Sequence, residues 1–187
     1  MHEGMQLEEL VELVDPAGRS TGEIGKLAAH RQPGKRHRAF SAFLFDPDGR
    51  LLLQRRAAGK YHSPGMWSNS CCGHPRPGEA PEAAVKRRVE AELTVRPHDL
   101  AQAGTINYRL TDPMSGLIEY EYSHVFVGHV LDLPIPDPTE VADIAMVAPA
   151  ELQPMMAREP FSVWFETVAH LAMTAAPALL PRFASGA

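Results

Sequence analysis

The sequence is poor in cysteine and lacks long apolar runs, and each shortage limits what the protein can be. Cys71 and Cys72 are its only cysteines, and a disulfide between sequence neighbours would strain both the bridge and the peptide that joins them. We therefore expect two free thiols in a reducing compartment. No apolar run approaches the roughly 20 residues that cross a membrane, and residues 1–9 are acidic where a secretory signal is basic and then apolar. These features predict a cytoplasmic protein outside the membrane.

An excess of positive charge, which would favour nucleic-acid binding, is also lacking, because the net charge is −5. Residues 1–95 nevertheless hold 14 Lys and Arg against 12 Asp and Glu, whereas residues 96–187 hold 4 against 11. A small anionic ligand is therefore expected to meet the N-terminal half. The length of 187 residues predicts one domain, 1–187, with an N-terminal extension at 1–10 and a less constrained region at 132–187.

Strand and helix patterns alternate along the chain without an internal repeat. The expected strands are 11–14, 39–45, 51–54, 104–110 and 117–130. Asp48-Gly49 suits a tight reversal, so the second and third strands are expected to form a hairpin, and the last two a second pair. Helices are expected at 81–93, where a proline stands in the first turn, and near 162–174. This mixture predicts a sheet with helices packed on its faces.

The helix at 81–93 carries charge on the stripe that should enter the core. Val85, Arg88, Val89 and Glu92 share one face at 100° per residue. Arg88 and Glu92 are either an i,i+4 ion pair at the edge of the stripe or a working pair, in which Glu92 meets a cation and Arg88 meets an anion.

Two carboxylates lie side by side on the strand at 117–130. Strand periodicity puts Glu119 and Glu121 on one face, where like charges repel unless solvent, a cation or a proton intervenes. With His30, His37 and His74 they make a donor set suited to a borderline divalent ion. The other six histidines require no special explanation.

Several spaced motifs occur together in this chain. They are Ala29-His30, the run 37–41, the run 54–56, the run Trp-Ser-Asn-Ser-Cys-Cys-Gly-His-Pro at 67–75, Tyr108-Arg109 and the run 119–121. In this order they closely resemble the type 1 isopentenyl-diphosphate isomerases of the Nudix superfamily. The resemblance covers 11–121 and extends more weakly to Trp164. It implies an α/β fold, the Nudix-type α/β/α sandwich with a mixed β-sheet.

By matched position, the resemblance also implies two ion sites and an anion site. One divalent ion, Zn²⁺, Mn²⁺ or Mg²⁺, would be held by His30, His37, His74, Glu119 and Glu121. A Mg²⁺ ion that bridges to a substrate diphosphate would be held by Glu92. The diphosphate itself would contact four cations of the N-terminal half, Lys26, Arg56, Lys60 and Arg88.

The implied reaction interconverts isopentenyl and dimethylallyl diphosphate, in isoprenoid biosynthesis, through a tertiary carbocation. Cys72 would be the catalytic thiol and Glu121 the opposing acid/base, with Tyr108 beside it. Trp164 would shield the carbocation with its indole face, although it also fits ordinary packing against Val168 at helical spacing. The expected partner is thus a small prenyl diphosphate, and the chain is expected to be a monomer or a homodimer.

The Nudix pattern itself is degenerate here. Gly, five residues, Glu, seven residues, Arg-Glu and a Glu-Glu pair become Gly73, Glu79, Arg87-Arg88 and Ala91-Glu92. The loss of two carboxylates at Arg88 and Ala91 disfavours a Nudix diphosphohydrolase. The same residues could also serve related chemistry on a longer prenyl diphosphate, or bind a prenyl diphosphate without catalysis. Thr94 replaces the usual glycine, so the end of the helix is expected to be shaped differently.

Overall fold

The computed structural model describes residues 9–180, so most of the expected N-terminal extension at 1–10 lies outside the described residues. The strands are β1 Leu10–Val14, β2 Ser20–Gly25, β3 His37–Phe45, β4 Leu51–Arg56, β5 Trp67–Ser68, β6 Cys71–Gly73, β7 His98–Thr111, β8 Ile118–His129 and β9 Val141–Val147. The helices are α1 Lys26–His30, α2 Pro81–Leu93, α3 Pro149–Met156 and α4 Phe165–Leu179. Among the described residues, none of these helices combines the length and the apolar character needed to span a membrane.

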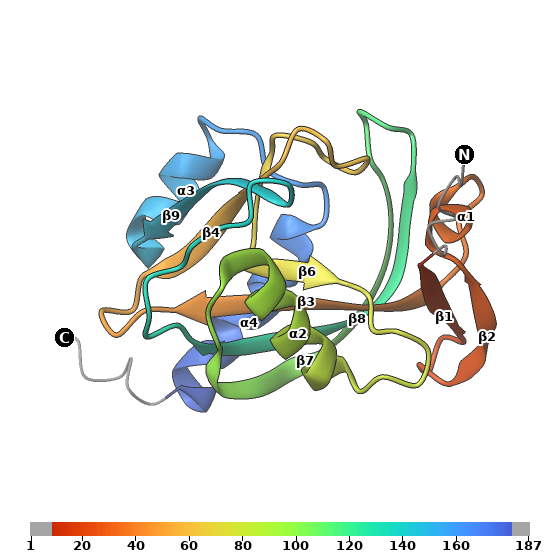
Figure 1. The fold of residues 1–187 in the computed structure, drawn as a ribbon, viewed down its shortest axis with the longest axis horizontal. Helices are drawn as coiled ribbons and strands as arrows, with labels where there is room; N and C mark the ends of the chain where they lie inside the picture. The colour runs from red at the N-terminus through yellow and green to blue at the C-terminus, as the bar shows by residue number, and fades with distance from the viewer. Residues whose placement is uncertain (1–8, 181–187) are drawn as a thin grey trace, which may run out of the picture.

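All nine strands belong to one mixed sheet with β3 at its centre (Figure 1). β3 pairs in parallel with β8, from His37 opposite Glu121 to Phe45 opposite His129, and antiparallel with the short strand β6. β7 pairs antiparallel with β8, and β4 pairs antiparallel with β5 and β9. Helix α2 packs on β3 and β6, whereas α4 packs on β7 and β8 from the other face. The predicted sandwich of helices around a mixed sheet is confirmed.

Two apolar cores lie on the two faces of β3 because its side chains alternate. Phe43 belongs to the core under α4, together with Phe165 of that helix. Phe40 and Leu44 belong to the core under α2, together with Val85. Each of these side chains is fully buried, which stabilises the fold by about 1.5–3 kcal/mol per large apolar residue.

The hairpin prediction is right at its turn and wrong beyond it. β3 and β4 pair only where Phe45 faces Leu51, and the strands then diverge. Ser70 bridges the gap, because its Oγ accepts a hydrogen bond from the Leu44 amide at 2.8 Å and donates one to the Leu52 carbonyl at 2.6 Å. The serine of the 67–75 motif therefore replaces ladder hydrogen bonds that the two strands cannot make with each other.

The end of α2 differs from the prediction made from Thr94. The helix has the predicted bounds, and Thr94 adopts the left-handed conformation that a glycine would take, with φ 57° and ψ 28°. Its amide donates to the Glu90 carbonyl at 3.0 Å, and its Oγ1 donates to the Ile135 carbonyl at 2.9 Å. The expectation of a different helix end was wrong, because these contacts hold a residue for which this conformation costs about 1–2 kcal/mol.

Candidate active site

One cavity lies where β3, β6, β7 and β8 meet α1 and the loop 57–66. Eleven of the thirteen site residues predicted from the sequence line it: Lys26, His30, Arg56, Lys60, Cys72, His74, Arg88, Tyr108, Glu119, Glu121 and Trp164. The other two, His37 and Glu92, contact lining residues from behind, because His37 lies 3.7 Å from Glu121 and Glu92 accepts a hydrogen bond from Arg88. The sheet therefore gathers residues that are nearly 140 positions apart in the chain into one place.

The strand register puts the predicted acid/base groups on one face of the sheet. His37 and Ser41 lie on the same face of β3 because they are four residues apart. Cys72 pairs with Ser41, and Glu121 pairs with His37, so both point to that face. Tyr108 lies directly opposite Glu121 on β7 and shares it as well.

The two free thiols have opposite surroundings. Cys71 pairs with Ala42 and is fully buried in the core under α2. Cys72 faces the cavity, where the Arg56 Nη1 lies 3.7 Å from its Sγ. Burial raises the pKa of the Cys72 thiol to about 11, although the nearby Arg56 charge opposes the shift. The thiol therefore carries its proton at neutral pH.

Two of the site histidines are oriented by hydrogen bonds from Nδ1 to the backbone. The Nδ1 atoms of His30 and His37 each lie 2.7 Å from a backbone carbonyl oxygen, that of Lys26 and that of Lys35. A carbonyl oxygen only accepts, so both Nδ1 atoms donate, and in the neutral rings both Nε2 atoms present lone pairs. The His37 Nε2 lies 3.2 Å from the His74 Nε2, a contact that repels unless a cation or a proton lies between them.

Glu121 completes this cluster. Its Oε1 lies 3.1 Å from the His74 Nε2, and its Oε2 accepts a short hydrogen bond from the Tyr108 hydroxyl. Burial alone would raise the pKa of Glu121, but its interactions with His37 and His74 outweigh burial and hold it well below its ordinary value. Burial also lowers the pKa of His74 far below its ordinary value. A carboxylate and imidazole nitrogens in this arrangement fit a divalent cation.

The fifth predicted ligand, Glu119, sits at the edge of this group. Ligand atoms of His30, His37, His74 and Glu121 all lie within 4.8 Å of one another, and Glu119 forms a second group of this kind with His30 and His62. The structure therefore brings four of the five together and adds His62, one of the six histidines for which no role was predicted. Both glutamates are buried, so the reading that solvent separates them was wrong.

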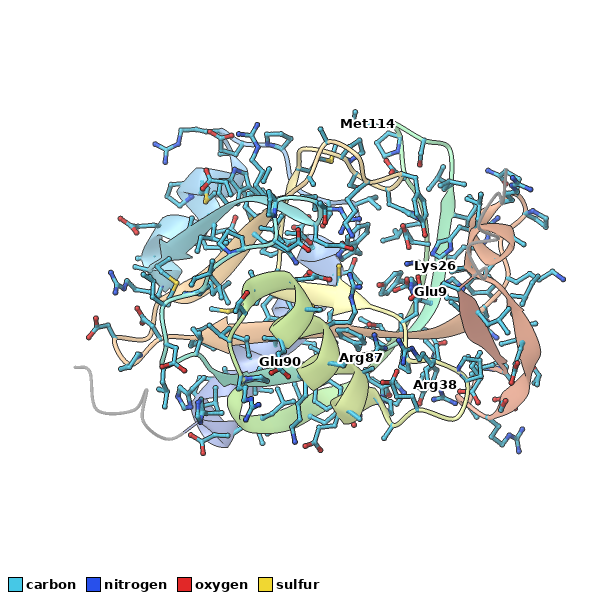
Figure 2. All side chains as sticks on the ribbon, in the orientation of Figure 1. Glu9, Lys26, Arg38, Arg87, Glu90 and Met114 are labelled. Carbon is cyan, nitrogen blue, oxygen red and sulfur yellow. The ribbon has the colours of Figure 1, made fainter. Side chains whose placement is uncertain are left out.

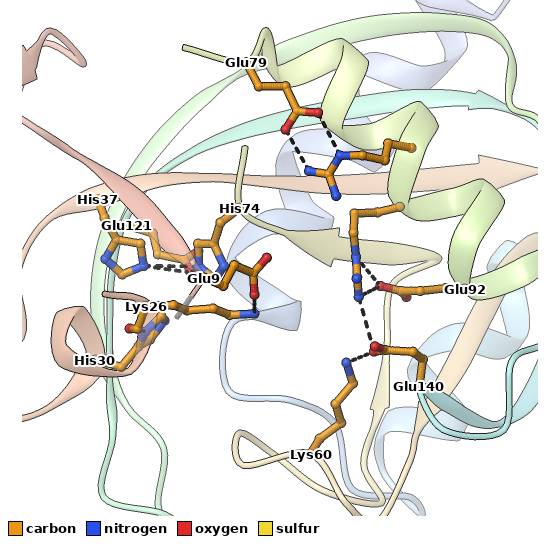
Figure 3. Close-up of polar contacts among 12 residues, drawn as sticks. Glu9, Lys26, His30, His37, Lys60, His74, Glu79, Glu92, Glu121 and Glu140 are labelled. Atoms are coloured by element: carbon orange, nitrogen blue, oxygen red, sulfur yellow. Dashed lines mark hydrogen bonds and ion pairs between the residues drawn. The ribbon is translucent and has the colours of Figure 1, made fainter. Parts of the chain in front are cut away.

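A chain of alternating charges lies apart from the histidines on the α2 side of the cavity (Figure 3). The Arg88 guanidinium binds the Glu92 Oε1 with its Nε at 3.0 Å and reaches the Glu140 Oε2 at 3.2 Å, and Glu140 also binds Lys60. Gln54 donates to the other Glu92 oxygen at 3.2 Å. Arg88 and Glu92 thus form the i,i+4 ion pair, and Arg88 also lines the cavity, so both predicted alternatives are compatible with the position of the pair. Glu140 was not predicted.

Lys26 approaches the cavity from α1. Figure 2 shows it beside Glu9, whose Oε2 lies 2.8 Å from the Lys26 Nζ. Lys26 and His30 are the first and last residues of α1. They face the same side of the helix because they are four residues apart. A predicted anion contact and a predicted ion ligand therefore come from one helical turn.

The motif at 67–75 also fixes Trp164. The Asn69 amide donates to the Ala42 carbonyl at 3.2 Å and to the Cys71 carbonyl at 2.7 Å. Its Oδ1 accepts a hydrogen bond from the Trp164 indole at 3.4 Å. Trp164 is buried, packs in the core with Val168 and also lines the cavity, with the Arg56 guanidinium 5.1 Å from its ring. Both readings of this residue are compatible with its position.

The fold and this site match the Nudix domain family. The family model for the NUDIX domain matches residues 35–166, and a crystal structure of a Deinococcus radiodurans protein aligns with a TM-score of 0.68 at 21% identity, covering 87% of this chain and 99% of that one. A MutT Nudix hydrolase from Burkholderia pseudomallei aligns with a TM-score of 0.58 at 20% identity, over 73% of this chain and 97% of its own. The protein is a Nudix-domain protein.

Proteins with similar sequences identify the family to which this Nudix-domain protein belongs. Proteins named isopentenyl-diphosphate Delta-isomerase from Streptomyces griseus and Streptomyces coelicolor are 59% and 60% identical over 159 residues, which are 85% of this chain and 81% of each relative. A protein of the same name from Nocardia farcinica is 48% identical over 87% of this chain and 93% of its own length. The chain belongs to the isopentenyl-diphosphate Delta-isomerase family.

Proposed function

We propose that the protein is an isopentenyl-diphosphate Delta-isomerase, which interconverts isopentenyl and dimethylallyl diphosphate. The observation that carries the proposal is that Cys72 and the Tyr108-bound Glu121 line one cavity from the same face of the sheet. The names of relatives at 59–60% identity support it. We place the reaction in the cytoplasm, in isoprenoid biosynthesis.

The reaction moves a double bond by adding one proton and removing another. A proton forms a new C–H bond at C4 of isopentenyl diphosphate and leaves a tertiary carbocation at C3. A C2–H bond then gives its electron pair to the new C2–C3 double bond, and its proton leaves to a base. Cys72 and Glu121 are the two groups that exchange these protons, and they swap roles in the reverse reaction. Such positioned transfer contributes about 10²–10⁴-fold to the rate.

The carbocation must be kept from water. Trp164 is 5% exposed and contributes an indole face to the cavity wall. A ring in this position stabilises a desolvated cation by about 0.5–2 kcal/mol. We therefore assign Trp164 both roles, core packing and shielding of the intermediate.

The charged end of the substrate meets the basic side of the cavity. Lys26, Arg56, Lys60 and Arg88 are the four lining cations, and we propose that they hold the diphosphate, with a Mg²⁺ ion held by Glu92. In the free protein Glu140 holds Lys60 and Arg88 together. The diphosphate would take over these contacts as it enters.

We propose that His30, His37, His74, Glu119 and Glu121 hold a divalent ion, Zn²⁺, Mn²⁺ or Mg²⁺. The fit rests on the His37 and His74 Nε2 atoms, which converge at 3.2 Å, with the Glu121 Oε1 3.1 Å from the His74 Nε2. When bound, the ion neutralises part of the negative charge of Glu121 and fixes the orientation of its carboxylate.

A Nudix diphosphohydrolase is the competing function. Hydrolytic relatives use clustered carboxylates to collect metal ions around a diphosphate. Here Arg88 occupies one such position and pairs with Glu92, and Ala91 occupies another. The remaining carboxylates favour proton transfer at the alkene over attack at phosphorus.

Radiolabelled isopentenyl diphosphate separates these functions. After incubation with the protein and Mg²⁺, acid releases the label only from an allylic diphosphate, because its carbocation is stabilised by resonance. We expect acid-labile label without phosphate release. Phosphate release without acid-labile label would indicate the hydrolase, and turnover of only a longer prenyl diphosphate would indicate the related chemistry.

A further inference from the structure

His62 is a buried histidine outside the set of residues that the family resemblance assigns. It lies in the loop 57–66 and is 6% exposed. Its Nδ1 lies within hydrogen-bonding distance of the Glu119 Oε1. Its ring is 4.3 Å from the ring of His30, at an angle of 72°. The residue therefore touches two proposed ion ligands at once.

Glu119 divides its two oxygens between different partners. The Oε1 faces His62, whereas the Oε2 lies 3.4 Å from the His30 Nε2. His30 donates through its Nδ1 to a backbone carbonyl, so its Nε2 carries a lone pair in the neutral ring. One oxygen of Glu119 and this nitrogen are thus left together on the side where the ion would bind.

The backbone that carries His62 is held by two hydrogen bonds. The Arg56 Nε donates to the His62 carbonyl at 3.0 Å. The next amide, that of Ser63, donates to the buried Asp112 Oδ2 at 2.7 Å, and Ser63 adopts a left-handed conformation with φ 42°. These two hydrogen bonds fix the peptide unit between His62 and Ser63, and so the point from which the imidazole reaches Glu119.

We propose that His62 is a positioning residue for the ion site: its Nδ1–H donates to the Glu119 Oε1 and keeps the Oε2 turned toward the ion. The inference rests on the metal site of the proposed function. His62 is grouped with His30 and Glu119 but not with the cluster around Glu121. The Nδ1 of His62 is directed at the Glu119 Oε1, the oxygen that does not face His30, which favours a role behind Glu119 over direct ligation.

Outer partners of this kind set the orientation of a ligand, and their loss weakens metal affinity by about 10–100-fold. The test therefore measures affinity directly. Protein stripped of metal by a chelator is titrated with Mn²⁺, and the free ion is followed by its electron paramagnetic resonance signal. The matched variants are His62→Asn, whose amide nitrogen reaches the place of Nδ1, and His62→Gln, whose amide nitrogen reaches the place of Nε2.

We expect His62→Asn to bind Mn²⁺ within about threefold of the parent chain, and His62→Gln and His62→Leu to bind about 10–100-fold more weakly. His124→Leu removes another histidine of the described structure, on β8 but outside the cavity, and should leave the affinity unchanged. Circular dichroism and melting of the metal-free proteins check that each variant folds. If His62→Leu does not fold, the Mn²⁺ affinities of His62→Asn and His62→Gln alone test the inference.

Equal Mn²⁺ affinity of His62→Gln and the parent chain would overturn the inference. Equal losses of affinity in His62→Asn and His62→Gln would also overturn it, because they would make the ring itself a ligand. In either case Mn²⁺ binding by the parent chain would leave the proposed metal site intact. A parent chain that binds no Mn²⁺ would overturn the metal site and the inference together, whatever its isomerase activity.

Discussion

Substitution of the two adjacent cysteines tests how the sheet assigns their roles. Cys72 faces the cavity and Cys71 the core under α2. Cys72→Ala removes a proton-exchanging group, so we expect kcat to fall by about 10²–10⁴-fold. Substrate affinity should change little, because the lining cations are untouched. Cys71→Ala removes a fully buried sulfur, about the size of one methylene group. We expect it to lower the free energy of unfolding by about 1 kcal/mol and to leave kcat nearly unchanged.

The two effects are separated by measuring acid-labile product and urea unfolding on the same preparations. A large loss of kcat in Cys72→Ala with normal stability, together with the reverse pattern in Cys71→Ala, is the expected result. Comparable losses of kcat at both positions would mean that the register of β6 is wrong by one residue. Full activity of Cys72→Ala would refute its proton-transfer role.

Three further predictions concern stability and metal. Thr94→Gly should be more stable to urea than Thr94→Ala by about 1 kcal/mol, because glycine accepts the left-handed conformation at this helix end without strain; equal midpoints would contradict this. Burial, and then the Arg38 charge, lower the pKa of His124 to about 4 from 6.5, so the unfolded state binds the extra proton between these values. The resulting stability is present above pH 6.5 and is lost as the pH falls toward 4. The slope of unfolding free energy against pH in this window should flatten in His124→Gln, and an unchanged slope would refute the assignment. Chelation should abolish isomerisation and Mn²⁺ should restore it; activity that survives verified metal removal would exclude a catalytic role for the ion.

The fold was predicted best for elements whose ends are determined by their own residues. Helix α2 has the predicted bounds because Pro81 favours its first turn and its apolar spacing ends at Leu93. Strand β7 begins at His98, six residues before the predicted start, because bulges interrupt its alternation opposite β8. Strands β5 and β6 are too short to show any period, and only their partners define them.

The residues of the candidate site were likewise predicted only in part. Motifs close together in the chain indicated Cys72 and His74, whereas His62 and Glu140 carry no motif. Glu140 meets Arg88 across 52 residues, and His62 meets Glu119 across 57 residues. Such contacts depend on how loops and strands are placed in space, which residue spacing does not encode.

Nuclear magnetic resonance of isopentenyl diphosphate in deuterated water tests the central claim most directly. With the protein and Mg²⁺ present, proton spectra report the position of the double bond and the uptake of deuterium, and phosphorus spectra report hydrolysis. If Cys72 and Glu121 exchange protons across the cavity, the spectra will show dimethylallyl diphosphate that carries solvent deuterium and an intact diphosphate. Free phosphate from an unmoved alkene, or a product without deuterium, would contradict the claim.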